Sequence, residues 1–269
     1  MNRQRGVGLV EVMISLVIGL MLLGALAYFF LGSQQMNRTH DDLSRMQESG
    51  RNAMEILGKA IRQAGYRLDV DQSLYVDSVK NIGAIAGTDG GGTGVSALPD
   101  TITIRHDPTW VQSATNPTNG SEADCQGNIV NSNNDAFDDY GKRNTNTSVI
   151  EYSFRIASTS GIPSLYCNTV ALNPATGGAI VIDNIENMQI TYGIGNGNGV
   201  ITSYKISPTT AELAQVTAVR VSLLVRGPST NIAVNKSQTY TYNGETATAT
   251  DGFLRQVYTS TFTVRNQTN

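Results

Sequence analysis

The stretch RGVGLVEVMISLVIGLMLLGALAYFF, residues 5–30, decides the architecture of this chain, because it is almost wholly apolar and yet contains one carboxylate, Glu11. No side chain in 12–31 is charged at neutral pH, and at about 1.5 Å per residue a helix of that length crosses a ~30 Å hydrocarbon core. Arg3 and Arg5 precede the apolar run, so the positive-inside bias predicts a cytoplasmic N-terminus. We therefore expect a membrane-spanning helix, with everything after it exported.

Glu11 has to be accounted for separately. A carboxylate inside a bilayer costs about 2.5 kcal/mol or more, and such residues usually have a partner or a function. A cleaved secretory signal would have a shorter apolar core that ends in a small-residue cleavage site, and neither property is present here. An uncleaved membrane anchor fits the length of the run but gives the carboxylate no role.

Residues 5–11, RGVGLVE, resemble the class III signal of type IV prepilins, in which a glycine is followed by an apolar residue and, at the fifth position, by a glutamate. The resemblance implies that a prepilin peptidase cuts between Gly6 and Val7 and methylates the new amine of Val7. The leader would then be residues 1–6. The family more often has phenylalanine where this chain has Val7.

The same resemblance implies a role for Glu11 in assembly, in which its carboxylate neutralises the terminal amine of a neighbouring subunit. Opposite charges attract strongly in a low-dielectric layer, so such a pair would form when subunits dock. Two roles within the subunit itself stay open as alternatives. The Val7 amine lies four residues away on the same helix, and the helix dipole favours an acid in the first turn.

The helix is predicted to continue beyond the membrane, because there is no proline between Gly32 and Gly65 and Gly65 is a natural stop. A narrow stripe of apolar and small residues follows a seven-residue repeat: Met36, Leu43, Gly50, Leu57 and Ala64 at one position, and Met46, Ala53 and Ala60 at the other. The residues expected on the solvated face are Arg38, Asp41, Asp42, Arg45, Glu48, Arg51, Glu55, Lys59 and Arg62. Because the stripe contains glycine and alanine, we expect it to pack on the chain's own sheet rather than in a two-stranded coiled coil. A helix over residues 8–65 would be about 87 Å long.

After residue 66 the pattern changes to short alternating runs typical of antiparallel sheet. Alternation is clearest in 101–106, 149–156, 188–192, 217–225 and 258–264. The predicted fold class is therefore α+β and pilin-like, with a long N-terminal helix packed by its C-terminal half on an antiparallel sheet. The predicted divisions are a leader at 1–6, a transmembrane helix at 7–32, its periplasmic continuation at 33–65 and a β-rich domain at 66–269.

Three late stretches, 179–194, 216–227 and 254–267, together with 61–67, resemble the PilW group of minor pilins. The late strands also resemble the J-type pseudopilins of type II secretion. The segment from about 69 to 147 resembles no family that we recognise. The resemblance implies a structural subunit that is stored in the inner membrane, with its C-terminal domain in the periplasm, and is then built into a surface pilus.

Cys125 and Cys167 are the only cysteines, and both lie in the exported part. An oxidising periplasm favours a disulfide between them, which would stabilise the domain by about 3–4 kcal/mol in the chain-entropy model. Two free buried thiols are the alternative. Neither cysteine has a second ligand at zinc spacing. Residues 131–141 offer oxygen atoms for calcium, but in no recognised order, so we expect no metal and no other cofactor.

No motif of nucleophilic, metal-dependent or phosphate-binding catalysis occurs in the sequence, so we expect no enzyme activity. His106 extends the apolar face of 101–106 and is expected to be a satisfied strand-end residue. The formal charge is -3, and loss of the leader with its two arginines would make it -5. That balance disfavours direct nucleic-acid binding by the subunit.

The favoured interpretation is a minor pilin that primes type IV pilus assembly and sits at or near the fibre tip, supporting twitching motility, adhesion or DNA uptake. Its expected partners are other minor pilins, the major pilin, the inner-membrane assembly platform and the prepilin peptidase. Two alternatives remain: a J-like pseudopilin of a secretion pseudopilus, and a signal-anchored periplasmic receptor or enzyme.

Overall fold

The structure is a computed structural model of the chain. It describes residues 8–66, 75–77, 80–81, 84–106, 121–123, 125, 129–131, 150–169, 178–196, 200–230 and 237–266.

One long helix, α1 (Leu9–Gln63), begins after Gly8 and runs for 55 residues without a break. At about 1.5 Å per residue it is about 82 Å long, close to the length expected from the sequence. It ends where predicted, because Gly65 adopts a positive φ of 75°. The backbone N–H of Gly65 donates to the carbonyl of Arg105 at 2.9 Å, which ties the end of the helix to a strand.

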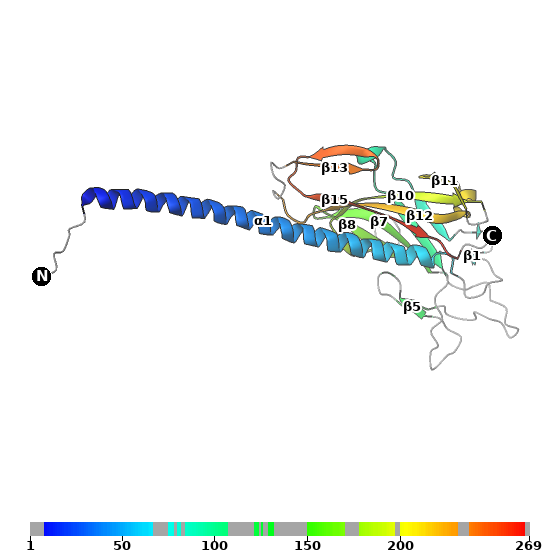
Figure 1. Cartoon of the computed structure of the whole chain (residues 1–269). Coiled ribbons are helices and arrows are strands. Elements are labelled where there is room, and N and C mark those ends of the chain that lie inside the picture. The colour runs from blue at the N-terminus through cyan, green and yellow to red at the C-terminus, as the bar shows by residue number, and fades with distance from the viewer. Residues whose placement is uncertain are drawn as a thin grey trace.

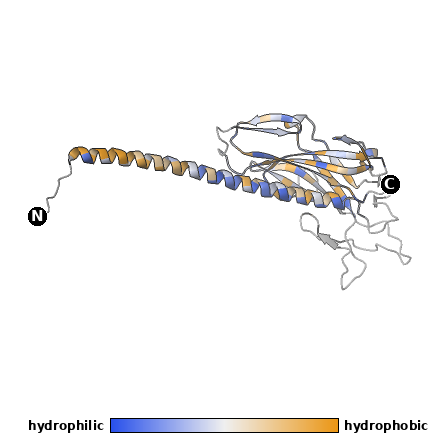
Figure 2. Cartoon of the chain, in the orientation of Figure 1, coloured by the Kyte–Doolittle hydropathy of each residue, from blue (hydrophilic) through white to orange (hydrophobic). Residues whose placement is uncertain are grey.

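The two halves of α1 have different surroundings (Figures 1 and 2). The N-terminal half projects away from the β-structure and is coloured as strongly hydrophobic in Figure 2. The C-terminal half lies along the strands and buries one face, which includes Met46, Gly50, Ala53 and Leu57. The predicted apolar stripe is therefore covered by the chain's own sheets. Met36, at its beginning, is 63% exposed, because cover begins only at Asp42.

The strands form two main antiparallel sheets. The four-stranded sheet has the order β11-β10-β12-β15, with bounds β10 (Ile185–Gly195), β11 (Ile201–Lys205), β12 (Val216–Arg226) and β15 (Arg255–Thr263). The five-stranded sheet has the order β3-β4-β7-β8-β9, with bounds β3 (Ile85–Thr88), β4 (Thr101–His106), β7 (Ile150–Thr159), β8 (Ile162–Thr169) and β9 (Ala179–Asp183).

Smaller elements complete the described part of the chain. Three two-stranded ribbons pair β1 (Tyr75–Asp77) with β2 (Lys80–Asn81), β5 (Ser121–Ala123) with β6 (Ile129–Asn131), and β13 (Gln238–Tyr242) with β14 (Glu245–Ala249). A 3-10 turn, η1 (Gly94–Ser96), and a short helix, α2 (Thr210–Leu213), are the remaining elements.

A single hydrophobic core joins the helix to both sheets. It contains α1 residues such as Leu57, β4 and β7 residues such as Ile102 and Phe154, and β12 residues such as Val221. The helix contacts β4 and β9 of one sheet and β12 and β15 of the other. The α+β fold class, with the C-terminal half of a long helix on antiparallel sheet, is therefore confirmed.

Two glycines set how closely α1 approaches β15. A Cβ on Gly50 would lie 2.5 Å from the Tyr258 ring, and a Cβ on Gly58 would lie 2.5 Å from the Phe262 ring. Eight helical residues rise about 12 Å and four strand residues about 13 Å, so the two spacings match. The helix and β15 therefore run alongside each other, with each ring lying against bare helix backbone.

The alternation in the sequence located most of the main strands. The predicted strand at 101–106 is β4, and those at 188–192 and 217–225 lie within β10 and β12. The β13–β14 hairpin was missed, although Asn243-Gly244 is the typical dipeptide of a two-residue turn and both residues have positive φ, 51° and 81°. The glycine-rich segment 87–100 begins in a strand, because Gly87 and Thr88 are the last residues of β3.

Candidate functional site

The projecting half of α1 is the largest exposed apolar surface in the described part of the chain. Side chains from Leu9 to Leu31 are exposed, and the aromatic ones strongly so: Tyr28 is 83% and Phe29 75% accessible. An apolar surface of this extent marks a membrane or protein contact. By length and composition α1 is able to cross a membrane.

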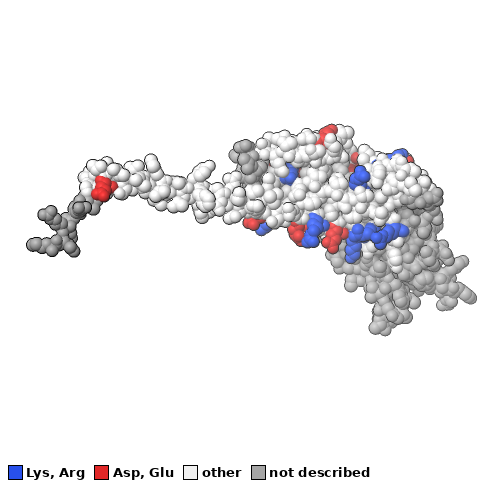
Figure 3. Space-filling view, viewed as in Figure 1, with Lys and Arg blue, Asp and Glu red and all other residues white. Residues whose placement is uncertain are grey.

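Glu11 is the one charged residue between Gly8 and Asn37. Figure 3 shows the projecting helix as uncharged apart from an acidic spot near its free end. Glu11 lies in the first turn of α1, where its backbone N–H donates to the Gly8 carbonyl at 3.0 Å. Its own carbonyl accepts from Ser15 Oγ at 2.7 Å. The carboxylate is exposed, so it is available to a cation outside the described residues.

The predicted cleavage residues, Gly6 and Val7, lie outside the described residues, as does the leader. The structure therefore places Glu11 but not the bond that the peptidase would cut.

Asp42 corrects one prediction about the solvated face of the helix, because it is buried, with 4% of its surface accessible. Its Oδ2 accepts from the backbone N–H of Ser229 at 3.2 Å and its Oδ1 from Ser229 Oγ at 3.1 Å. This carboxylate ties the segment after β12 to the helix at the point where α1 enters the domain. The other eight residues predicted for that face are exposed.

The disulfide predicted between Cys125 and Cys167 is present, with the two Cα atoms 6.1 Å apart. Cys167 lies on β8 and is fully buried in the core, and Cys125 packs against that core. The bond therefore fastens a point in the segment between β4 and β7 to a buried position on β8 of the five-stranded sheet.

A second anchor surrounds Arg255, at the start of β15. Its guanidinium donates to Glu186 at 2.6 and 2.9 Å and to Asp251 at 2.8 and 2.6 Å. Gln238 of β13 bonds both backbone groups of Arg255, so the cluster also holds the β13–β14 ribbon. The hydrogen bond from Arg255 lowers the pKa of Asp251 to about 2, and the same bond raises the pKa of Arg255.

Asp100 and Tyr192 also have shifted pKa values, and both side chains are buried within the fold. Asp100 is buried and accepts from the N–H groups of Gly90 at 2.9 Å and Ile190 at 2.7 Å, while burial raises its pKa. Burial likewise raises the pKa of Tyr192. His106 is buried at the end of β4, as its place on the apolar face predicted.

Within the described residues, no three histidine, cysteine, aspartate or glutamate side chains are grouped so that they could hold a metal ion. What the described part offers is a rigid domain on a long helix with an exposed apolar half. The arrangement is suited to assembly through the helix, and the single carboxylate at its start is the polar group available to that interface.

Two family matches agree with this interpretation. Residues 153–266 match the family of the type IV pilus-assembly protein W, and residues 1–27 match the prokaryotic N-terminal methylation motif. No curated protein matches the sequence. Among solved structures, a type IV-like pilin from Thermus thermophilus is similar at 11% identity and a TM-score of 0.41, over 86% of this chain and all of that one.

The two family matches cover different parts of the fold. The methylation motif covers the start of the projecting helix, including Glu11, and the other match covers the strands from β7 to β15. Residues 153–266 thus carry the sequence pattern of the PilW family of type IV pilus-assembly proteins, and residues 1–27 carry the prokaryotic N-terminal methylation motif.

Proposed function

We propose that the protein is a minor pilin that primes type IV pilus assembly and stays at or near the tip of the fibre. The observation that carries the proposal is a continuous 55-residue helix whose apolar first half is uncovered and has one carboxylate, in its first turn. Such a helix can be stored in a bilayer and then transferred into a bundle of similar helices without refolding the domain. The role is structural rather than catalytic.

The proposed route begins in the inner membrane, with the N-terminus in the cytoplasm and the domain in the periplasm. The prepilin peptidase cuts between Gly6 and Val7 and methylates Val7, which removes residues 1–6. Residues 7–32 then hold the subunit in the membrane, residues 33–65 continue the helix into the periplasm, and residues 66–269 form the domain displayed on the fibre.

Glu11 supplies the recognition step in this proposal. Its carboxylate is exposed on the single subunit, and in lipid an unpaired charge of this kind costs about 2.5 kcal/mol or more. Docking beside the Val7 amine of a neighbouring pilin removes that cost. The pair therefore favours the assembled helix bundle over the isolated subunit.

The partners that follow are the other minor pilins, the major pilin, the inner-membrane assembly platform and the peptidase. The fibre would serve twitching motility, adhesion or DNA uptake. Contact with DNA would fall to other subunits, because the processed chain has a formal charge of -5 after loss of two arginines from -3.

The test is mass spectrometry of sheared fibres and of membranes from the cells that make the protein. The wild type should be found in both, starting at a methylated Val7. Gly6→Val should stay uncut in the membrane, because the peptidase must approach the backbone closely.

Glu11→Ala should be cut normally but be several-fold poorer in fibres than in membranes, relative to the wild type. An equal ratio of fibre to membrane protein for Glu11→Ala and wild type would refute the role of Glu11. Absence of the wild type from fibres would refute the minor-pilin proposal itself.

A further inference from the structure

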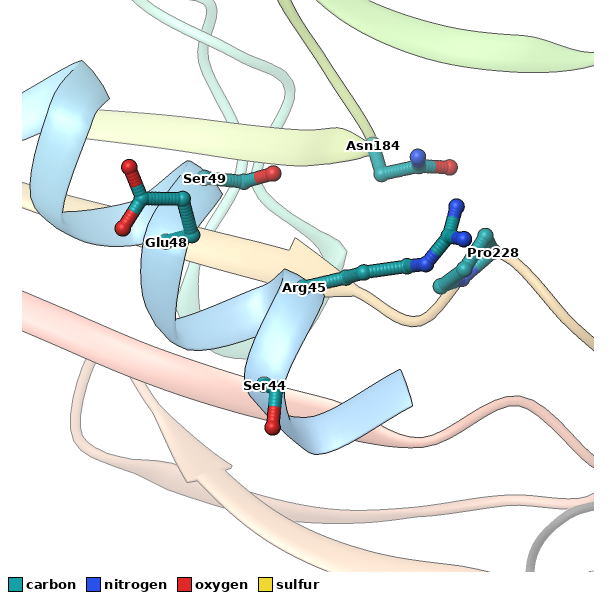
Figure 4. Close-up of a pocket in the computed structure, with 6 residues that line it drawn as sticks. All are labelled: Ser44, Arg45, Glu48, Ser49, Asn184 and Pro228. Carbon is teal, nitrogen blue, oxygen red and sulfur yellow. The ribbon is translucent and has the colours of Figure 1, made fainter. Parts of the chain in front are cut away.

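A shallow hollow lies beside α1, close to where the helix enters the domain (Figure 4). Four of its residues, Ser44, Arg45, Glu48 and Ser49, come from α1, and the other two, Asn184 and Pro228, follow β9 and β12. In Figure 4 the side chain of Arg45 reaches away from the helix to Pro228, with Asn184 on the other side of its guanidinium. Helix and both sheets therefore contribute to one small surface.

The far wall of the hollow is held rigidly. The carbonyl of Asn184 accepts from the N–H of Arg226 at 2.9 Å. On either side of Pro228, the N–H of Gly227 donates to the Leu254 carbonyl at 2.8 Å and Ser229 is bound by the buried carboxylate of Asp42. A ligand would thus meet a preformed wall, with little ordering to be done on binding.

Arg45 is the unneutralised charge of this surface. Within the described residues it makes no ion pair, and two of the acids near it on the helix, Asp42 and Glu48, are bonded to other groups. Glu48 accepts from Arg51 at 3.1 Å and from Asn52 at 2.8 Å, which lowers its pKa. Asp42 is occupied by Ser229, and no ion pair joins Arg45 to Asp41 among the described residues. The guanidinium therefore keeps its full donor capacity.

The donors around the hollow fit a carboxylate. A guanidinium offers parallel N–H groups to the two oxygens of a carboxylate, and the Asn184 amide can add a further donor beside it. The neighbouring charge of Glu48 opposes a doubly charged anion such as a phosphate. A small molecule would stay largely in water here, whereas pockets for small ligands bury most of their ligand. A carboxylate on the surface of another protein is different, because the rest of that surface would cover the hollow and exclude water from the contact.

The position of the hollow identifies that surface. Arg45 lies 34 residues beyond Glu11 on the same unbroken helix, which is about 51 Å at 1.5 Å per residue. If a neighbouring pilin packs beside the uncovered half of α1, as the proposed function requires, a neighbour that continues along the helix axis on this side would reach this rim of the domain. The hollow is thus continuous with the helix interface that the proposed function requires.

We propose that this hollow, with Arg45 at its centre, is a docking site for an aspartate or glutamate side chain of an adjacent pilin subunit. The pair fixes the neighbour about 51 Å above the contact made by Glu11, so the two contacts define both the height and the rotation of one subunit against the next. This inference rests on the proposed minor-pilin function and assigns a second contact to it.

The experiment places a photo-activatable benzophenone side chain at Ser44 of the full chain, in the cells that make it. Irradiation should cross-link the chain to another pilin, through a peptide of that pilin that contains an acidic residue. Arg45→Glu should lower the yield about tenfold, which corresponds to about 1.4 kcal/mol. Lys59→Glu is the matched control, because it makes the same change of charge about four turns farther along the same helix, away from the hollow, and should leave the yield unchanged.

Reversal of the partner's acidic residue to arginine should restore the cross-link in the Arg45→Glu chain. Equal loss in Arg45→Glu and Lys59→Glu, a partner peptide without an acid, or no pilin cross-link at all would overturn the docking site. The cross-link is read in membranes as well as in fibres. Failure of the docking site is therefore distinguishable from failure of the proposed function, which is judged by the presence of wild-type protein in fibres.

Discussion

Replacement of Gly50 by alanine tests how the long helix is held to the domain. The new Cβ would lie 2.5–2.7 Å from three atoms of the Tyr258 ring, whereas carbon atoms in contact prefer about 3.5–4.0 Å. The ring or the helix must move, and overpacking of this kind costs about 1–3 kcal/mol. Alanine recovers up to about 1 kcal/mol through its higher helix propensity. We expect a net loss of about 1–2 kcal/mol.

For a domain of this size each kcal/mol shifts the melting temperature by about 2–4 °C, so Gly50→Ala should lower it by about 2–8 °C. The measurement is thermal unfolding of the full chain in detergent, followed by near-ultraviolet circular dichroism of the domain. Gly24→Ala is the control, because no atom lies within 4 Å of a Cβ at that position on the same helix. It should not lower the melting temperature of the domain.

A double-mutant comparison makes the cause specific. In a Tyr258→Ala background the ring is gone, so Gly50→Ala should raise the melting temperature through helix propensity alone. The reasoning is refuted if Gly50→Ala has the same effect in both backgrounds, or if it stabilises the otherwise wild-type chain.

Three further changes probe the other anchors. Asp42→Ala should cost about 1–3 kcal/mol, because it removes the two hydrogen bonds by which the buried carboxylate holds Ser229, while Asp41→Ala, on exposed surface, should stay within about 0.5 kcal/mol by the same melting assay. Cys125→Ser should remove the mobility difference between reduced and non-reduced protein on gels and cost about 3–4 kcal/mol; quantitative alkylation of thiols in the unreduced wild type would contradict the bond. The pKa of Asp251 is lowered to about 2 by Arg255, so its stabilisation is complete above pH 4 or so and is lost as the pH falls towards about 2. The melting temperature of wild type should therefore exceed that of Asp251→Asn at neutral pH and converge with it in acid, and a constant difference down to that pH would rule out the ion pair as the cause.

The long helix and most of the main strands could be predicted because their signals are local. A seven-residue apolar stripe and a period-two alternation depend on neighbours in sequence, and residues such as Leu57 and Val221 are buried as those patterns require. Glu11 could be singled out for the same reason, since its motif spans seven residues.

The rest depends on pairs that are far apart in the chain. From the sequence alone, Asp42 was predicted to lie on the solvated face of the helix. Its burial depends on Ser229, which is 187 residues later in the chain. Gly50 was predicted to be a small residue of the apolar stripe, but nothing near it in the sequence indicates that it packs against the Tyr258 ring. The hollow at Arg45 is formed by one helix and two separate connecting segments, and a periodic pattern in the sequence cannot predict that these segments lie together. The division of the strands into two sheets is set by the same long-range pairing.

The contact between α1 and β15 also constrains the order of events as the chain is made. The helix emerges first and, on the proposed route, is anchored in the membrane, whereas Tyr258 and Phe262, which cover its glycines, are translated roughly 200 residues later and would be exported after it. Until they arrive, the face at Gly50 and Gly58 has no cover from β15. Contacts so distant in sequence close late and slowly in folding. On the proposed route, the C-terminal half of the helix would complete its packing only after the last long strand had crossed the membrane, so a subunit would present a finished domain to the fibre only when its export was almost complete.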